Sequence, residues 1–203
     1  VNHFEQIDHR IRVCLANGEN LDADLVLLSI GVRPSTNLAT EAGIRVGRGI
    51  QVDEYLETSV PDIFAVGDAI EYPHPITGEN WLNYLAGPAN RQARIVADNM
   101  VRGKQEKYEG SIGTAIAKVF DLTVATTGLP AKRLKQAGIA YASSTTVSAA
   151  HAGYYPGPFR LTTKLTFDPQ MGRLLGAQCV GNDGVDKRID QIALIIKQGG
   201  TVQ

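Results

Sequence analysis

The sequence predicts an α/β fold followed by a sheet-rich α+β domain, and three observations support this prediction. Residues 25–30 read Leu-Val-Leu-Leu-Ser-Ile, a continuous apolar run typical of a strand buried on both faces. Residues 63–66 form a second apolar run, which stops at Gly67-Asp68. After Gly110 strand patterns dominate, which indicates a separate domain.

Composition favours an ordinary globular protein that binds small molecules or other protein chains. The 203 residues are 43% hydrophobic, and 20 basic against 21 acidic residues leave a formal net charge of -1. This balance argues against nucleic acid or an anionic membrane as a partner. No apolar run approaches the roughly 20 residues of a membrane span, and no signal peptide is recognisable at the start, so we expect a soluble, cytoplasmic protein. Cys14 and Cys179 have no C-x-x-C spacing or histidine companion, so neither a metal site nor a disulfide is predicted.

The first half of the chain alternates strands with a helix. Residues 11–15 predict a strand that enters a hairpin at Asn17-Gly18. The return strand is expected near Leu21, and residues 49–52 predict another short strand. A helix should begin around Pro88, end at Gly103 and turn one face inward, the face formed by Ala89, Ala93, Val96, Ala97 and Met100.

The second half predicts a sheet with two helices. Strands are expected at residues 114–119, 122–127, 141–147, 161–167 and 174–180. A short helix at 131–136 follows Pro130, and a final helix runs from about residue 185 to Gly199. Residues 168–172 should form a turn between two strands.

The most informative motif is the segment from Thr58 to Asp68, which reads Thr-Ser-Val-Pro-Asp-Ile-Phe-Ala-Val-Gly-Asp. An acid delivered after a glycine at the carboxyl end of a strand is a ligand-holding arrangement in α/β sheets. Asp68 could accept hydrogen bonds from sugar or ribityl hydroxyls, and Gly67 would let the backbone approach the ligand. From the pattern alone, an Asp68 that only caps the next segment is an equal alternative.

This segment resembles the second FAD motif of flavoproteins with two dinucleotide-binding domains. The resemblance implies FAD contacts from the residues that match it, and a ribityl contact from Asp68; the matching residues are Thr58, Ile63, Phe64, Ala65, Gly67 and Asp68. Residues 23–34 resemble the strand and G-x-R-P turn that lead from the NAD(P)H-binding domain back to the FAD domain. In that interpretation Gly31 lies near the nicotinamide, although a single glycine more often only terminates a strand.

Two further segments extend the resemblance. Residues 85–92 would lay a helix N-terminus, with Ala86 and Ala89, against the flavin, and Asn90 could touch substrate. Residues 151–157 are similar to the H-A-x-Y-x-P-G loop of CoA-disulfide reductases, which reaches the partner subunit's active site. Tyr154 is then the principal catalytic candidate and Tyr155 a substrate contact, although two loop tyrosines more often serve packing or an interface. We expect His151 to be a structural residue of this loop, not an acid-base catalyst.

The chain as a whole is identified as resembling the C-terminal half of a pyridine nucleotide-disulfide oxidoreductase, most like CoA-disulfide reductase. Residues 1–47 would end the NAD(P)H-binding domain, 48–110 form the second FAD segment and 111–203 form a dimerisation domain truncated at its C-terminus. The implied parent enzyme uses NAD(P)H and FAD to reduce CoA disulfide or a related small disulfide, as a homodimer. NADH oxidase or peroxidase and polysulfide reductase are alternatives.

The 203 residues contain no G-x-G-x-x-G turn, and neither cysteine matches the family's redox motif. Both ends of the sequence look cut. We therefore expect each nucleotide site to be incomplete in this chain, and a non-catalytic dimerisation and partial flavin-binding module is the competing hypothesis.

Overall fold

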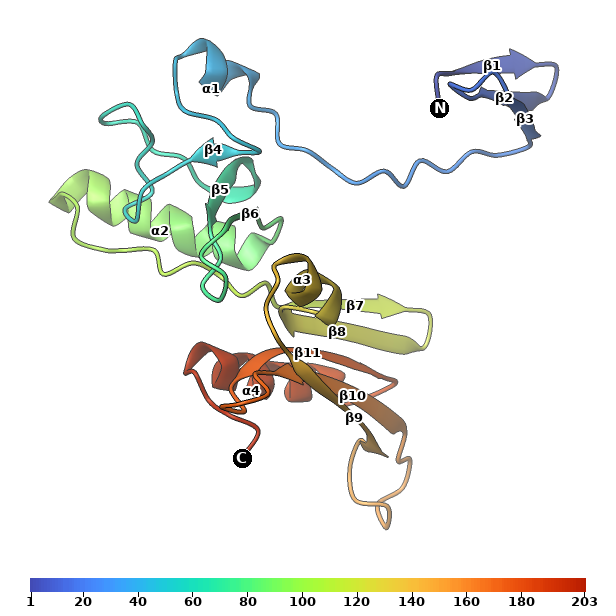
Figure 1. Cartoon of the computed structure of the whole chain (residues 1–203), viewed down its shortest axis with the longest axis vertical. Coiled ribbons are helices and arrows are strands. Elements are labelled where there is room, and N and C mark those ends of the chain that lie inside the picture. The colour runs from blue at the N-terminus through green and yellow to red at the C-terminus, as the bar shows by residue number, and fades with distance from the viewer. The chain divides into compact units, whose positions relative to one another are not determined.

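The computed structural model describes residues 1–203, which form two units, residues 1–33 and residues 34–203 (Figure 1). The chain builds three sheets and a few helices, which confirms the predicted mixture of α/β and sheet-rich α+β parts. None of the helices has the length and apolar character that a membrane span requires.

The first unit is an antiparallel meander of β1 (His3–Ile7), β2 (Arg10–Cys14) and β3 (Asn20–Ala23). The predicted hairpin at Asn17-Gly18 is confirmed, with Gly18 at a φ of 87° that favours glycine. Alternation along β2 separates two faces of the meander. One face carries Arg10, Arg12 and Cys14, and the other carries Ile11 and Val13.

The predicted buried strand at residues 25–30 is wrong. These residues have no regular structure, and Leu25, Leu27 and Ile30 are 78, 82 and 87% exposed. A strand buried on both faces needs hydrogen-bonded neighbours and covering layers, and no strand of the chain pairs with this segment. The apolar pattern is present, but its packing partners are not.

The second unit begins with the short helix α1 (Asn37–Glu41) and a small three-stranded sheet. Its strands are β4 (Ile50–Gln51), β5 (Ile70–Pro73) and β6 (Asn80–Leu82), in the order β4-β5-β6. The predicted short strand at 49–52 is confirmed as β4. β5 and β6 were not predicted from the sequence.

The prediction of a strand at residues 63–66 is wrong, because the segment forms only an isolated bridge. Phe64 makes a single bridge to Glu57, and Ala65 donates its N–H to the carbonyl of Leu56. The segment then enters a turn of 3₁₀ helix, η1 (Gly67–Ala69). With only one partner on one edge, these residues do not extend the sheet.

Helix α2 (Ala86–Arg102) ends at Gly103, as predicted, but its inner face differs from the prediction. Of the predicted face only Val96 is buried, while Ala93, Ala97 and Met100 are exposed. The buried residues are Gln92, Ile95, Val96 and Asn99. Two of these are polar residues whose side chains satisfy neighbouring backbone groups, which an apolar pattern cannot reveal.

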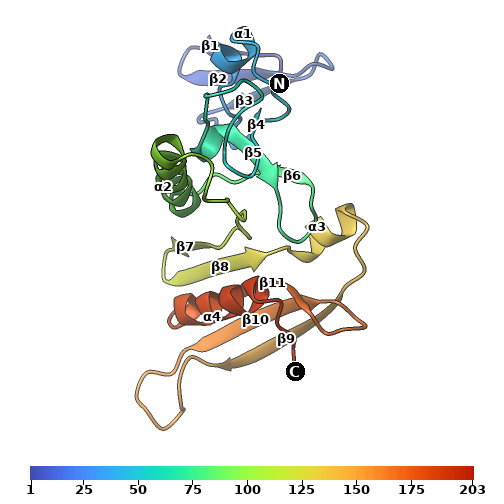
Figure 2. The same ribbon diagram turned by 90° about the vertical axis from the view of Figure 1, so that its left-hand side faces the viewer.

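Residues after Gly110 build a five-stranded antiparallel sheet in the order β7-β8-β11-β10-β9 (Figure 2). All five strands were predicted to within about two residues, and they are β7 (Ala115–Val119), β8 (Leu122–Gly128), β9 (Ala142–Ala149), β10 (Arg160–Phe167) and β11 (Leu174–Gly181). Helices α3 (Ala131–Gln136) and α4 (Val185–Lys197) are also confirmed.

Helix α4 packs against one face of this sheet. Val185 and Ile189 of the helix meet Ala125, Leu161 and Cys179 of the strands, and all five are at most 1% exposed. At the end of the sheet, Gly176 permits close approach of another segment. A Cβ there would lie 2.3 Å from the carbonyl oxygen of Leu129. The turn at residues 168–172 is confirmed by hydrogen bonds from two backbone N–H groups to Asp168 Oδ1.

Candidate functional site

The turn at Gly67-Asp68 is held against helix α2 by one buried amide. The N–H of Gly67 donates to Gln92 Oε1 over 2.7 Å, and Gln92 is 4% exposed. Gly67 has a φ of 80°, which a residue with a side chain rarely adopts. The sequence therefore places glycine where the chain must turn toward the helix.

Gln92 also ties this turn to Tyr108. The amide hydrogen-bonds the Tyr108 hydroxyl, and burial raises the pKa of that phenol above its ordinary value despite this bond. The Tyr72 hydroxyl in turn donates to the backbone carbonyl of Tyr108, and the two rings meet edge to face at 4.9 Å. The polar side of the site is thus connected to the core formed by Leu56, Ile70 and Ile95.

Asp68 leaves this anchored turn with its side chain exposed. The 3₁₀ turn has no side-chain cap, and the Asp68 carboxylate accepts no hydrogen bond from the chain. The interpretation that Asp68 only caps the following segment is therefore not supported. The carboxylate is available to an external donor.

The N-terminus of α2 is also uncapped. Its N-cap is Leu85, which offers no side-chain acceptor, so the N–H groups of Ala86 and Gly87 are available at the positive end of the helix. Ala86 is exposed and Ala89 half-buried. Asn90 is exposed, with its Nδ2 donating to the Ala86 carbonyl at 3.0 Å. These are the positions that the sequence had associated with a flavin.

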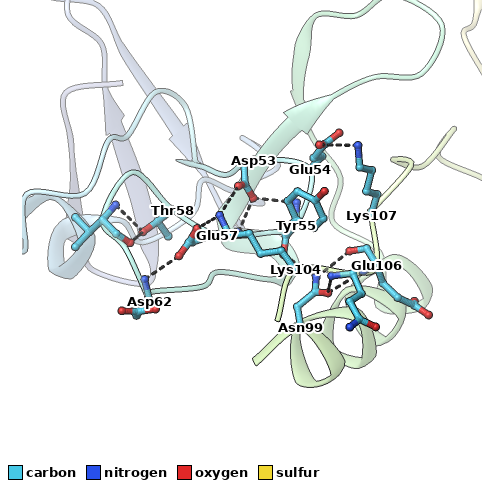
Figure 3. A network of polar contacts seen from close by, with 12 residues as sticks. Asp53, Glu54, Tyr55, Glu57, Thr58, Asp62, Asn99, Lys104, Glu106 and Lys107 are labelled. Carbon is cyan, nitrogen blue, oxygen red and sulfur yellow. Dashed lines mark hydrogen bonds and ion pairs between the residues drawn. The ribbon is translucent and has the colours of Figure 1, made fainter. Parts of the chain in front are cut away.

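A polar network fixes the segment that leads into the turn (Figure 3). Lys104 bridges Glu57 and Asp53, with 3.3 Å to Asp53, and Lys107 pairs with Glu54 at 2.7 Å. The Lys104 ammonium lowers the pKa of Glu57, assisted by the backbone N–H of Asp62. Figure 3 shows these side chains converging from the loop after α2 onto residues 53–62.

Asn99 and Thr58 complete the network. Asn99 Oδ1 accepts from the N–H groups of Gln105 and Glu106, which shapes the loop carrying both lysines. Thr58 Oγ1 accepts from the N–H of Val60, and its own N–H donates to the carbonyl of Ile63. Thr58 thus has a structural role in the turn that directs residues 63–68 toward α2.

A buried carboxylate, Glu71, joins the two strands behind the turn. Burial raises its pKa, but hydrogen bonds from the Gln51 side chain and from the N–H groups of Arg48 and Gly49 outweigh this effect, so the net pKa lies below the ordinary value. A Cβ on Gly47 would lie 2.2 Å from Glu71 Oε1. Glycine is required there because the loop wraps directly around the carboxylate.

The two predicted loop tyrosines lie apart from this turn. Tyr154 is 93% and Tyr155 65% exposed in the loop between β9 and β10, which projects from the far end of the second unit (Figures 1 and 2). His151 meets Tyr155 edge to face at 5.4 Å, in keeping with a structural role in the loop. Gly31, at a φ of 78°, belongs to the first unit. The structure thus brings together the residues around Asp68 but neither loop tyrosine.

Comparison with known proteins decides the family. Residues 1–87 match the model of the pyridine nucleotide-disulphide oxidoreductases, and residues 114–203 match the model of their dimerisation domain. The chain belongs to the pyridine nucleotide-disulphide oxidoreductase family. This confirms the family resemblance recognised from residues 58–68 and 151–157.

Several oxidoreductases of this family resemble the chain. An NADH oxidase of Methanocaldococcus jannaschii is 33% identical over 92% of the chain, and an NAD(P)H sulfur oxidoreductase (CoA-dependent) of Pyrococcus furiosus is 33% identical over 96%. A coenzyme A disulfide reductase of Staphylococcus aureus is 32% identical over 88%. The chain spans 42, 44 and 41% of the length of these three relatives.

Solved structures agree with these relatives. The crystal structure of reduced Bacillus anthracis CoADR-RHD superposes with a TM-score of 0.87 at 44% identity. It covers 96% of this chain, which corresponds to 35% of that chain. The arrangement of the small sheet, α2 and the five-stranded sheet is therefore that of the disulphide oxidoreductases.

The sequence did not indicate two buried polar residues, Gln92 in the site and His74 after β5. His74 is 2% exposed, accepts from the N–H of Ile76 at its Nδ1, and has no hydrogen-bond partner at Nε2. Burial, followed by the charge of Arg133, lowers its pKa to about 4. The Gln92 contact joins residues 25 positions apart, and the burial of His74 depends on tertiary packing, so no local pattern indicated either role.

Proposed function

We propose that this chain forms part of an FAD-dependent NAD(P)H:disulfide oxidoreductase that reduces CoA disulfide or a related low-molecular-weight disulfide. The observation that carries the proposal is the Gly67-Asp68 turn, held by Gln92 beside the uncapped start of α2. The turn offers a free acceptor and the helix offers free donors. Family membership supplies the reaction class.

The residues present fit the ribityl and flavin end of FAD. Asp68 would accept hydrogen bonds from the ribityl hydroxyls, and the close turn at Gly67 leaves room for them. The N–H groups of Ala86 and Gly87 would stabilise negative charge on the flavin ring. When bound, FAD supplies hydride acceptance from NAD(P)H and electron delivery to a disulfide.

The exposed loop tyrosines fit a role in the partner subunit's site. Tyr154 carries a phenol that can donate a hydrogen bond or proton to a leaving thiolate. It is 93% exposed and lies away from Asp68 within its own chain, so it would act across a dimer. Tyr155 and Asn90 would contact substrate, and Gly31 would lie beside the nicotinamide.

Replacement of Asp68 tests the flavin site. In the complete product of the gene, Asp68→Asn should lower the ratio of flavin absorbance to protein, because the amide loses half of the carboxylate's acceptor capacity. The matched control is Asp62→Asn in the preceding turn, at a φ of 63° that asparagine tolerates. Equal flavin content in both variants would contradict the assignment.

Turnover distinguishes the substrates. The complete product should oxidise NAD(P)H with CoA disulfide, and Tyr154→Phe should reduce this turnover by about 10²-fold while flavin reduction by NAD(P)H stays unchanged. NADH oxidase and sulfur reductase activities are supported by the names of two relatives. Faster turnover with oxygen or polysulfide than with CoA disulfide would favour those alternatives.

The isolated 203-residue chain provides a second test. The competing proposal is a non-catalytic dimerisation and partial flavin-binding module, because the sequence contains neither glycine-rich turn. It predicts a colourless preparation without NAD(P)H-dependent disulfide reduction. A yellow, active preparation of these 203 residues would contradict that alternative.

The homodimer is proposed to form through residues 111–203. On the sheet face opposite α4, a row of directly paired residues crosses all five strands, namely Ala117, Val124, Val180, Thr162 and Val147. Val124 and Val147 are 40 and 62% exposed. A second copy would bury this row.

Light scattering tests the interface. Val124→Glu and Val147→Glu should shift the chain toward monomer, because a charge would be desolvated in the interface. Met171→Glu is the control, since Met171 is 75% exposed in a turn outside the row. A chain that is monomeric before mutation at high concentration would overturn the proposed dimer.

A further inference from the structure

Three side chains with metal-binding chemistry meet on the first unit. The ligating atoms of His3, Glu5 and Cys14 all lie within 4.8 Å of one another. His3 Nε2 and Glu5 Oε1 are 3.0 Å apart. The set combines an imidazole, a carboxylate and a thiol, three groups that bind Zn²⁺ in proteins.

Strand geometry creates this cluster. Alternation along β1 places His3 and Glu5 on one face, two residues apart. The antiparallel register pairs His3 directly with Cys14 of β2. The histidine companion that Cys14 lacks in the sequence is therefore supplied by the neighbouring strand, eleven positions away.

The nearby arginines make their hydrogen bonds to other acids, not to the cluster. Arg12 lies opposite Glu5 in the register, but its guanidinium makes two hydrogen bonds to Asp22, at 2.8 and 3.2 Å. Arg10 pairs with Asp24 at 3.1 Å. The two basic residues of β2 thus pair with acids on and just after β3, and Glu5 remains beside His3 and Cys14.

We propose that His3, Glu5 and Cys14 form a Zn²⁺ site. Zinc bonds of about 2.0–2.3 Å in tetrahedral geometry require ligand atoms somewhat under 4 Å apart, close to the spacing present. The His3 and Glu5 side chains are 52 and 47% exposed, so both have room to adjust and admit the ion. Cys14, 8% exposed, provides the inner ligand, and water completes the coordination.

Binding would fasten β1 to β2. The meander has no helix of its own. An ion shared by two strands would stabilise their pairing, because metal affinity for the folded form adds to its stability. The site lies on the first unit and is independent of the flavin chemistry proposed for the second.

Cobalt substitution tests the proposal on the intact 203-residue chain. Titration with Co²⁺ should give a thiolate-to-cobalt charge-transfer band that saturates at one ion per chain and disappears when Zn²⁺ is added. Cys14→Ser should abolish the band, and His3→Asn should weaken Zn²⁺ binding at least tenfold. His9→Asn is the matched control, because His9 is exposed on the same hairpin but outside the cluster.

A measurement on the unmodified chain tests the site without relying on variants that could misfold. Zn²⁺ should slow alkylation of Cys14 at least tenfold, as measured by peptide mass mapping, and an excess of chelator should restore it. Cys179, buried in the other unit, serves as the internal reference. Absence of the charge-transfer band, or Cys14 alkylation that is indifferent to Zn²⁺, would overturn the site.

Discussion

Residues 25–30 and strand β11 are both rich in apolar residues, yet their structures are opposite. The sequence predicts a strand at each, buried on both faces in the case of residues 25–30, and residues 25–30 are the more apolar of the two. β11 lies between β8 and β10 and carries Ala177 and Cys179 under α4. Residues 25–30 have no strand neighbour and remain exposed. The comparison teaches that an apolar pattern specifies a capacity for strand formation, which only neighbouring strands and covering layers realise.

Amide exchange should show the largest difference between these two segments. The amides of β11 should exchange only through global opening, so a stability of about 5 kcal/mol would slow them by roughly 10³- to 10⁴-fold. Residues 25–30 should exchange near the unprotected rate, since their N–H groups have no strand partner. Hydrogen exchange with mass spectrometry makes the measurement, and equal protection would contradict the comparison.

A glycine substitution can break β11 directly. Gly176→Ala places a Cβ within 2.8 Å of three backbone atoms of Leu129, so we expect a loss of about 4 kcal/mol or more, or failure to fold. Gly153→Ala is the control, because nothing lies within 4 Å of its Cβ position. Urea unfolding measures both. Equal stability of the two variants would show that β11 can move away from Leu129.

Truncating one leucine in each region sharpens the comparison. Leu161→Ala, next to β11 in the core, should cost about 2–5 kcal/mol through lost burial and the cavity left behind. Leu27→Ala should change the free energy of unfolding by less than about 0.5 kcal/mol, because Leu27 is already 82% exposed. A large cost at Leu27 would reveal packing that the structure does not show.

His74 extends the comparison to a polar residue that depends on burial. Its pKa of about 4 lies below the ordinary 6.5, so the folded state favours the neutral ring. The contribution of His74 to the free energy of unfolding is complete above pH 6.5. It is lost as the pH falls toward 4, and the loss is at most about 3 kcal/mol. Between pH 6.5 and 5, where most carboxylates stay ionised, His74→Phe should flatten the pH dependence of urea unfolding, whereas His9→Asn should not. If the free energy of unfolding of His74→Phe kept the same slope against pH, the imidazole of His74 would be accessible to water in the folded state.

Sequence patterns predicted the second half of the fold well because that half supplies its own partners. The strands and helices after Gly110 alternate, turn and stop where glycine and polar residues indicate, and α4 covers the sheet that its own sequence neighbours form. The strand prediction at residues 25–30 was wrong for the converse reason, because no strand of the chain pairs with them. The predicted inner face of α2 was wrong because Gln92 and Asn99 are buried with their hydrogen bonds satisfied. An apolar pattern gives no information about such polar residues.

The candidate site was only partly predictable. The motif ending at Asp68 is contiguous in sequence, so its glycine and its acid could be recognised before the structure. The partners that position it are not contiguous. Gln92 lies 25 residues from Gly67, and Cys14 meets His3 through strand register. Contacts of this kind become visible only when the elements are placed in space.

The bridging amide of Gln92 limits which residues can occupy its position. The amide oxygen must accept a hydrogen bond from the Gly67 N–H while the amide nitrogen must donate one to the Tyr108 hydroxyl, and the side chain must be long enough to reach both. A carboxylate of equal length would present two acceptors and introduce a buried charge, and a shorter amide would not span the gap. Glutamine therefore meets both requirements, as long as the turn and the tyrosine stay as they are.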